Sequence, residues 1–185
     1  MHNIFKRRRG QAPSPLYLGV CQADMIDKEL LHKTVGDAID GTDLFIVDIS
    51  VSPDNTITVT LDSPTSVDID ECAKVTRAIE AAFDRDAEDY ELEVGSAGIT
   101  SPMQIRAQFV KNEGNDVEIL TRDGRKLHGV LIGVEAGDMH DRDVAFTVEV
   151  PVRVKEPGMK KAEMRNESLR LTSGECKYVR YDLKF

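Results

Sequence analysis

Tryptophan, other aromatic residues and cysteine are scarce in this chain of 185 residues. It has no tryptophan, only 5% aromatic residues, and three widely spaced cysteines, Cys21, Cys72 and Cys176. An odd number of cysteines without a CxxC pair indicates neither a disulfide framework nor a cysteine zinc site. We therefore expect free thiols in a reducing cytoplasm.

Long apolar runs are also lacking. A membrane helix needs roughly 20 consecutive apolar residues, and no segment approaches that length, so a membrane-spanning helix is excluded. The hydrophobic content of 41% and the charged content of 31% are typical of a globular protein. A chain of this length forms one medium or two small domains and needs no metal or disulfide to fold.

The charge is acidic overall and unevenly distributed. Lysine and arginine total 24 against 33 aspartate and glutamate, a net charge of −9, which divides into +3 over residues 1–24, −13 over 25–99 and +1 over 100–185. Such a balance argues against coating of nucleic acid by bulk charge. The change from an acidic to a nearly neutral segment predicts two domains with different partners. The acidic half favours a basic protein partner, unless its charge serves solubility alone.

Residues 1–24 form a basic leader that we expect to be disordered. A signal peptide is a poor interpretation, because the apolar stretch Leu16–Cys21 is shorter than an h-region and follows Pro13 and Pro15. A second hypothesis is that the leader arises from an upstream start codon, since a well-patterned helix begins at Met25.

The acidic half is predicted to be an α/β domain in which two helices cover one face of a small three-stranded mixed sheet. Helical spacing of apolar residues, a capping box formed by Asp68 and Glu71, and alternating strands support this prediction. The predicted elements are a helix over Met25–Asp40, a hairpin of Leu44–Val51 with Ile57–Leu61, a helix over Ile69–Asp84 and a strand over Tyr90–Val94.

Gly95–Pro102 is predicted to be a constrained loop, either an ordinary tight loop or a linker that fixes the angle between two domains. Gly98 is available for a positive φ angle, and Pro102 suits the first turn of the next helix. We expect the inner side of that helix to carry Ile105, Phe109 and Val110.

The remaining residues predict four or five short strands that form a small barrel. Asp123-Gly124 is predicted to be a two-residue hairpin turn, and the polar segment Lys155–Ser168 a mobile loop. The predicted strands cover Val117–Thr121, Lys126–Val134, Val144–Val154 and Tyr178–Phe185.

No segment carries a recognised catalytic motif. The run Asp138–Asp143 contains three carboxylates and a histidine, but it lacks metal-ligand spacing such as HExxH and is better interpreted as a solvated turn. We therefore predict no catalytic residues, no metal site, no cofactor and no enzymatic activity. The alternative, a hydrolase with a carboxylate or metal site, rests on this cluster alone.

Three segments resemble one known family in the same order along the chain. Glu91–Pro102 is similar to the signature Glu-Val-Ser-Ser-Pro-Gly of the bacterial ribosome maturation factor RimP family, Ile69–Ile79 to its second helix, and Asp123–Leu131 to the first hairpin of its C-terminal domain. The chain departs from the signature at Gly95 and Ala97, which flank the retained Ser96. Ser101 stands where the family has arginine, which puts a salt bridge or RNA contact at that position in doubt.

The resemblance implies an α+β fold with an N-terminal α/β domain and a C-terminal all-β Sm-like (SH3-type) small barrel. It also implies a non-enzymatic assembly factor that binds free small (30S) ribosomal subunits in the cytoplasm and assists their maturation. The implied partners are 16S rRNA and a basic ribosomal protein near the decoding region, and we expect a monomer with no membrane partner. The expected boundaries are 1–24 for the leader, 25–99 for the N-terminal domain, 100–114 for the linker and short helix, and 115–185 for the barrel.

Four groups of residues are candidates for functional or architectural roles. The first two are the signature loop, with Glu93, Ser96, Gly98 and Pro102, and the barrel turns, with Asp123, Gly124 and Gly129. The other two are an acidic docking set, Asp40, Asp43, Glu88, Asp89 and Glu91, and a basic set for RNA contact, Lys155, Lys160, Lys161 and Arg165.

A function of another class is a free-standing Sm-type chaperone that acts on small regulatory RNAs. Ring-forming Sm proteins bind RNA through a basic pore and lack a large acidic domain. The net charge of −13 over residues 25–99 argues against this alternative.

Overall fold

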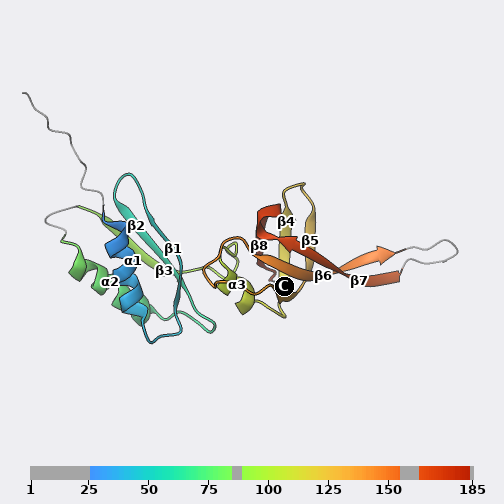
Figure 1. The fold of residues 1–185 in the computed structure, drawn as a ribbon, viewed down its shortest axis with the longest axis horizontal. Coiled ribbons are helices and arrows are strands. Elements are labelled where there is room, and N and C mark those ends of the chain that lie inside the picture. Colours follow the sequence, from blue (N-terminus) through green and yellow to red (C-terminus); the bar gives the residue numbers. More distant parts are fainter. Residues whose placement is uncertain (1–25, 85–88, 155–162, 184–185) are drawn as a thin grey trace, which may run out of the picture.

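The computed structural model describes residues 26–84, 89–154 and 163–183. The described chain has two hydrophobic cores joined by a single segment, which we call the N-terminal half (26–96) and the C-terminal half (103–183) (Figure 1). The predicted basic leader lies outside the described residues. No helix among those described is long and apolar enough to cross a membrane.

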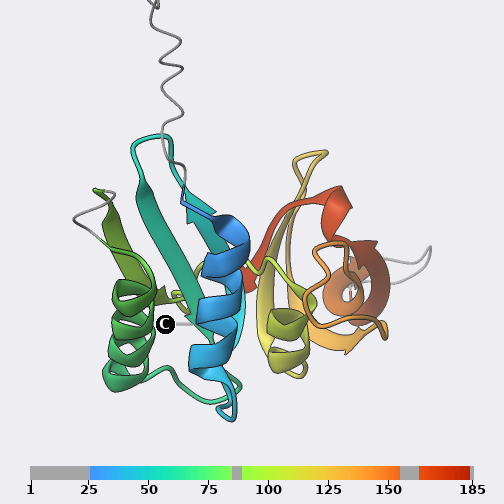
Figure 2. The same ribbon diagram turned by 60° about the vertical axis from the view of Figure 1, so that its left-hand side comes forward.

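The N-terminal half has two helices on one face of a three-stranded sheet (Figure 2). Strands β1 and β2 pair antiparallel, β2 and β3 pair parallel, and the sheet order is β1-β2-β3. The predicted helices, hairpin and mixed sheet are confirmed. The elements are α1 (Lys28–Ile39), β1 (Phe45–Val51), β2 (Thr56–Asp62), α2 (Ile69–Ala82) and β3 (Glu91–Ser96).

Local side-chain chemistry sets the helix starts. The Asp27 carboxylate accepts hydrogen bonds from the backbone N–H groups of Glu29 and Leu30, so α1 begins at Lys28 rather than at the predicted Met25. The predicted capping box of Asp68 and Glu71 is present, with 2.9 Å between the Asp68 backbone nitrogen and Glu71 Oε2.

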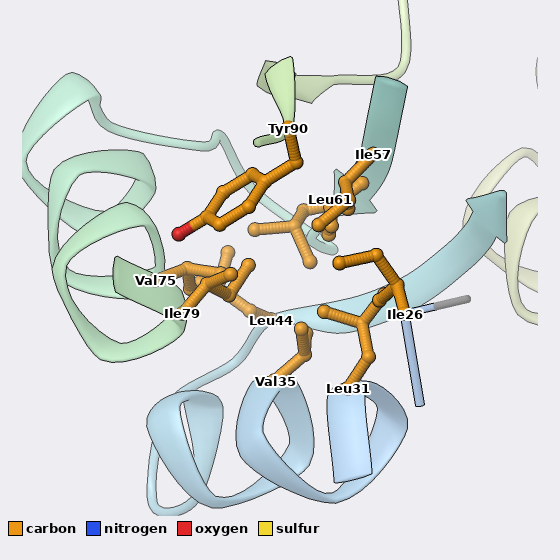
Figure 3. Packing of buried hydrophobic residues seen from close by; sticks show 10 residues of the cluster. Ile26, Leu31, Val35, Leu44, Ile57, Leu61, Val75, Ile79 and Tyr90 are labelled. Atoms are coloured by element: carbon orange, nitrogen blue, oxygen red, sulfur yellow. The ribbon is translucent and has the colours of Figure 1, made fainter. Parts of the chain in front are cut away.

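The first core lies between the helices and the sheet, where apolar side chains from all layers converge (Figure 3). Tyr90 is buried at the start of β3, and its hydroxyl points toward α2, where it donates to the Phe83 carbonyl. The fully buried members include Leu31 and Val35 of α1, Ile57 and Leu61 of β2, and Val75 and Ile79 of α2.

The segment between the halves differs from the predicted loop. Gly95 and Ser96 continue β3 by pairing with β2, so the connecting segment is shorter than predicted. The φ angle of Gly98 is not positive. The glycine instead provides space, since a Cβ there would lie 2.9 Å from Ser101 Oγ.

Helix α3 (Arg106–Lys111) begins four residues after Pro102, which is therefore not in its first turn. Ile105 and Phe109 are buried as predicted, whereas Val110 is exposed, so the prediction for Val110 was wrong. The helix ends at Asn112, and Gly114 follows at a φ angle of +83°.

The C-terminal half is a five-stranded antiparallel sheet in the order β7-β6-β5-β4-β8, covered at one end by α3 (Figure 1). Its second core includes Phe109 and Phe146, whose ring centroids lie 5.2 Å apart. The strands are β4 (Asp116–Thr121), β5 (Lys126–Val134), β6 (Ala145–Val154), β7 (Glu163–Thr172) and β8 (Cys176–Tyr181), with a short 3₁₀ turn η1 (Ser173–Glu175) before β8.

Two predictions about turns were wrong in detail. Residues 122–124 form a three-residue loop, because the Thr121 N–H donates to the Arg125 carbonyl and Gly124 has a φ angle of +91°. Gly129, predicted to be in a turn, lies within β5 and pairs with Val117.

Part of the predicted mobile loop is a strand. Glu163–Ser168 belongs to β7, which pairs with β6 along its whole length, and the outer part of this β6–β7 ribbon extends beyond the rest of the sheet (Figure 1). Strand β5 pairs with β6 only from Phe146 to Glu149, so the outer ribbon lacks a third strand. The outer part of β7 is exposed over residues 164–168, so its polar sequence lacks the alternation that reveals a half-buried strand.

The predicted closed barrel is not confirmed. Strand β8 lies beside β4, which brings the first and last strands of this half together, but no backbone pairing among the described residues joins β7 to β8. In the part of the chain that the structure describes, the fold is α+β with three helices and two open sheets.

Gly129 supports a prediction about stability. A Cβ at this position would lie 2.3 Å from the Glu149 backbone oxygen, whereas one at Gly133 of the same strand would meet nothing within 4 Å. We expect Gly129→Ala to lower the free energy of unfolding by about 1–3 kcal/mol, as overpacking does. Gly133→Ala is the control and should be neutral within about 1 kcal/mol. Denaturant unfolding of both variants measures the difference, and equal stabilities would contradict the close approach of β5 and β6.

Candidate functional site

The connecting segment is hydrogen-bonded to both halves. The Ala97 N–H donates to the Leu61 carbonyl of β2, and the Met103 N–H donates to the Val179 carbonyl of β8, each at 2.8 Å. Between them, the Ser101 N–H donates to the Gly98 carbonyl and closes a turn. These bonds restrict the segment at both ends, as expected of a linker that fixes an angle.

Asp62 joins the two halves through its carboxylate. It is the last residue of β2, and its Oδ1 lies 2.7 Å from Lys111 Nζ while its Oδ2 accepts from Gln108 Nε2 at 3.2 Å. The Asp62 side chain is 11% exposed and that of Lys111 28% exposed. The Ser63 backbone N–H also donates to Oδ1 at 2.8 Å, and the two side-chain partners of the carboxylate come from α3.

A second polar contact lies on the β1 side of the junction. Arg142 Nη2 lies 2.5 Å from Asp48 Oδ1 of β1, and Nη1 donates to Gln104 Oε1 at 3.2 Å. Near this ion pair, Val47 and Ile105 are both buried although neither belongs to either core, and they line one hollow with Arg142. The junction therefore has a small apolar centre with an ion pair nearby.

The acidic run Asp138–Asp143 binds a buried arginine. Arg106 is 6% exposed, and its guanidinium donates to the carbonyls of Glu135 and Asp138 and to Asp141 Oδ2. Gly137 is needed at this place, because a Cβ there would lie 2.5 Å from the guanidinium. A buried guanidinium in this loop opposes a bound cation, so the geometry favours the structural turn over the metal-dependent hydrolase.

Sequence reasoning missed the role of Arg106. The only signal was the density of carboxylates in the run itself, which nothing local in the sequence connects to a residue 32 positions earlier.

The signature loop lines a groove between the halves. Ser96 and Gly98 lie on its wall together with Asp62, Lys111 and Tyr181, and the groove has a volume of about 350 Å³. The other two signature residues lie elsewhere: Glu93 is exposed on β3, and Pro102 is exposed in the connecting segment without lining the groove. The structure therefore brings together two of the four predicted loop residues.

The predicted acidic docking set is divided between the two ends of the N-terminal sheet. Asp40 and Asp43 precede β1 at the end where Phe45 pairs with Asp62, whereas Asp89 and Glu91 lie at the end where Thr56 pairs with Glu91. At roughly 3.3 Å per residue, these ends are about 20 Å apart. Glu88 lies outside the described residues.

Most residues of the predicted basic set lie outside the part of the chain that the structure describes. Lys155, Lys160 and Lys161 are not among the described residues, whereas Arg165 lies in β7 opposite Val152, on the outer part of the β6–β7 ribbon. Of the predicted barrel-turn residues, Asp123 accepts hydrogen bonds from Thr121 and Arg125 and Gly124 supplies the positive φ angle.

A charged cluster on the outer face of β4, β5 and β8 is centred on Glu118. This carboxylate accepts from the Tyr178 hydroxyl at 2.6 Å and lies 2.7 Å from Arg180 Nη2 and 3.0 Å from Lys126 Nζ. The Tyr178 hydrogen bond, followed by those from Lys126 and Arg180, overcomes the effect of burial and lowers the pKa of Glu118 from 4.5 to about 2.

One triad of potential metal ligands is found among the described residues. Ligand atoms of Glu118, His128 and Asp182 lie within 4.8 Å of one another, and His128 Nδ1 lies 2.8 Å from Asp182 Oδ2. Lys126 and Arg180 already neutralise Glu118, so the arrangement favours a network of ion pairs over a cation site.

The junction generates the prediction that Asp62→Ala destabilises the protein. Removing the carboxylate leaves Lys111 and Gln108 without their acceptor, and we expect a loss of about 1–3 kcal/mol in the free energy of unfolding. Asp37→Ala, which breaks the exposed Lys33–Asp37 pair, is the control and should change stability by less than about 0.5 kcal/mol. Residual dipolar couplings should also report a changed orientation of the halves in Asp62→Ala alone; unchanged couplings would contradict the role of this contact.

The low pKa of Glu118 predicts a defined dependence of stability on pH. A carboxyl group whose pKa is lower in the folded state stabilises the fold above its unfolded value and loses that effect as the pH falls. The contribution of Glu118 should therefore decline from about pH 4.5 toward pH 2. Thermal unfolding over pH 2–7 should show a smaller decline for Glu118→Gln, and for Tyr178→Phe a decline that begins at the same pH but is smaller and is complete at a higher pH, because the folded-state pKa of Glu118 rises without the Tyr178 hydrogen bond. Identical profiles for all three proteins would rule out this role for the cluster.

Comparison with known proteins identifies one family. The RimP N-terminal domain matches residues 34–100, which covers α1 from its middle turn to the end of β3. Proteins named ribosome maturation factor RimP from two strains of Porphyromonas gingivalis are 37% identical over 153 residues, which is 83% of this chain and 96% of theirs. The protein of that name from Flavobacterium psychrophilum is 34% identical over 112 residues, 60% of this chain and 70% of its own length. The resemblance of three collinear motifs is thereby confirmed, and the chain belongs to the RimP family of ribosome maturation factors.

Proposed function

We propose that this protein assists maturation of the small (30S) ribosomal subunit in the cytoplasm by binding free small subunits as a non-enzymatic assembly factor. One observation carries the proposal: similarity to ribosome maturation factors extends over 96% of the length of the Porphyromonas gingivalis relatives. A role in ribosome maturation is non-enzymatic in kind, and the charged clusters among the described residues serve structural ion pairs.

The acidic half supports a basic ribosomal protein as one partner. Residues 25–99 carry a net charge of −13, and such a surface attracts a basic protein and accelerates its association. In the proposed complex, this half contacts a basic protein near the decoding region, while the neutral C-terminal half lies closer to 16S rRNA.

The β6–β7 ribbon is the proposed site of RNA contact. Residues 151–170 contain six basic and three acidic side chains, in contrast to the acidic half. Arg153 and Arg165 lie on the described part of this ribbon, which projects from the sheet (Figure 1). A projecting basic element reaches phosphate groups that the body of an acidic protein would repel.

We also propose that the architecture follows the predicted division at 25–99, 100–114 and 115–185, with residues 115–185 forming an Sm-like barrel. The adjacency of β4 and β8 and the antiparallel order of the five strands support this description. The protein acts as a monomer in this proposal, since its net charge of −9 opposes self-association.

Co-sedimentation with separated small subunits, large subunits and assembled ribosomes tests the proposed function. We expect the protein to bind free small subunits alone and to lose affinity as the salt concentration rises. Absence from every particle, together with a multimeric ring in analytical ultracentrifugation, would favour the small-RNA chaperone instead.

Charge reversal locates the acidic contact, because the structure separates the two ends of the sheet. Asp40→Lys with Asp43→Lys changes one end, and Asp89→Lys with Glu91→Lys changes the other. Asp70→Lys with Glu80→Lys on α2 makes the same change in net charge and serves as the control. We expect at least one end variant to bind small subunits about tenfold more weakly than the control at low salt. Equal binding of all three would exclude a docking role for either end.

A further inference from the structure

An apolar groove crosses the junction between the two halves. It has a volume of about 460 Å³ and is formed by both halves of the chain. The N-terminal half contributes Phe45 at the start of β1 and Pro64. The C-terminal half contributes α3 and the loop before β6. Its apolar lining consists of Phe45, Pro64, Ala107, Val110 and Met139.

Two of these side chains have no role in either core. Val110 is 39% exposed and Met139 is 51% exposed, and neither belongs to a core cluster. Phe109 already supplies the core contact of α3, so Val110 points outward from a helix of six residues. Apolar side chains gathered in a concave surface mark an interaction site more strongly than scattered ones.

The charge beside the groove is negative. An adjoining hollow shares Phe45 and His140 with the groove and is lined by Asp40. Within the described ranges, Asp40 and Asp43 form no ion pair. Helix α1 also ends here without a basic residue in its last turn, so its C-terminal carbonyl groups add negative potential.

The nearby cations do not offset this charge. Lys111 lines the groove but is paired with Asp62, and Arg142 is paired with Asp48. The surface therefore combines an apolar groove with unpaired carboxylates and a helix C-terminus at one edge.

We propose that this groove binds a basic segment of a protein partner. A bulky apolar side chain of the segment enters between Phe45, Val110 and Met139, and a neighbouring lysine or arginine lies against Asp40 and Asp43. The inference rests on the proposed function and specifies the chemistry of its protein partner. The carboxylates would repel RNA, and a second copy of this chain would bring a net charge of −9 to the same edge.

Photo-crosslinking tests the occupant directly. A photoreactive phenylalanine derivative replaces Val110 in one protein and Ile132, an exposed residue of β5 outside the groove, in the other. Each protein is irradiated with purified free small subunits, and separately with the rRNA-free total protein extracted from them. We expect position 110 to crosslink a basic protein in at least one arm and position 132 to give at least tenfold less of that product.

The two arms separate failure of the inference from failure of the proposed function. Crosslinks from position 110 to rRNA or to a second copy, or no crosslink in either arm, would overturn the groove's assignment even if the unmodified protein sediments with small subunits. A basic protein crosslinked only in the rRNA-free arm, without sedimentation on any particle, would keep the assignment and reject the proposed function.

A matched substitution provides an independent measurement. Val110→Thr places a hydroxyl in the groove, and we expect about tenfold weaker binding to the total small-subunit protein, because an apolar partner leaves that hydroxyl unpaired. Ile132→Thr makes the same kind of change elsewhere and should leave binding unaltered. Equal affinities for the two variants, each with a normal thermal unfolding curve, would also overturn the proposal.

Discussion

The Asp62 carboxylate constrains the arrangement of the whole molecule. Asp62 is the last residue of β2 and is only 8% exposed. An unpaired carboxylate is costly in such a buried place. Besides the Ser63 backbone N–H, its partners are Gln108 and Lys111 of α3, a helix that packs Phe109 into the second core. One buried charge therefore connects the two halves through a six-residue helix, and the hydrogen bonds of the linker and the Arg142–Asp48 pair join the same two halves at other points.

The carboxylates of this protein differ in role according to where they lie. The carboxylates at the junction are paired, as in Asp62 with Lys111, Asp48 with Arg142 and Asp141 with Arg106. Those at the free ends of the N-terminal sheet remain toward solvent. The acidic half thus uses part of its charge to hold the structure and leaves part toward solvent, and this division is compatible with the proposed contact with a basic protein.

The elements that the sequence predicted correctly are those whose signals are local. The capping box of Asp68 and Glu71 and the apolar spacing of α2 both lie within one element. Val110 was misassigned because six helical residues are too few to show a period. The outer part of β7 was missed because its residues 164–168 are all exposed, and the burial of Arg106 depends on carbonyl groups some 30 positions away. The groove at the junction joins segments that are distant in sequence, so no sequence pattern could reveal it.

The position of β8 has a consequence for the order in which the chain folds during synthesis. Of the described strands, β8 is the last to be made, yet it pairs with β4, which is made about 60 residues earlier, and its outer edge receives the Met103 N–H of the linker. The N-terminal half contains all partners of its own sheet before the ribosome reaches residue 100. It can therefore fold while the C-terminal half is still being translated, whereas the edge of β4 stays open to other strands until β8 emerges. The second sheet gains β8, and the linker gains its second anchor, only after β4 to β7 have been made.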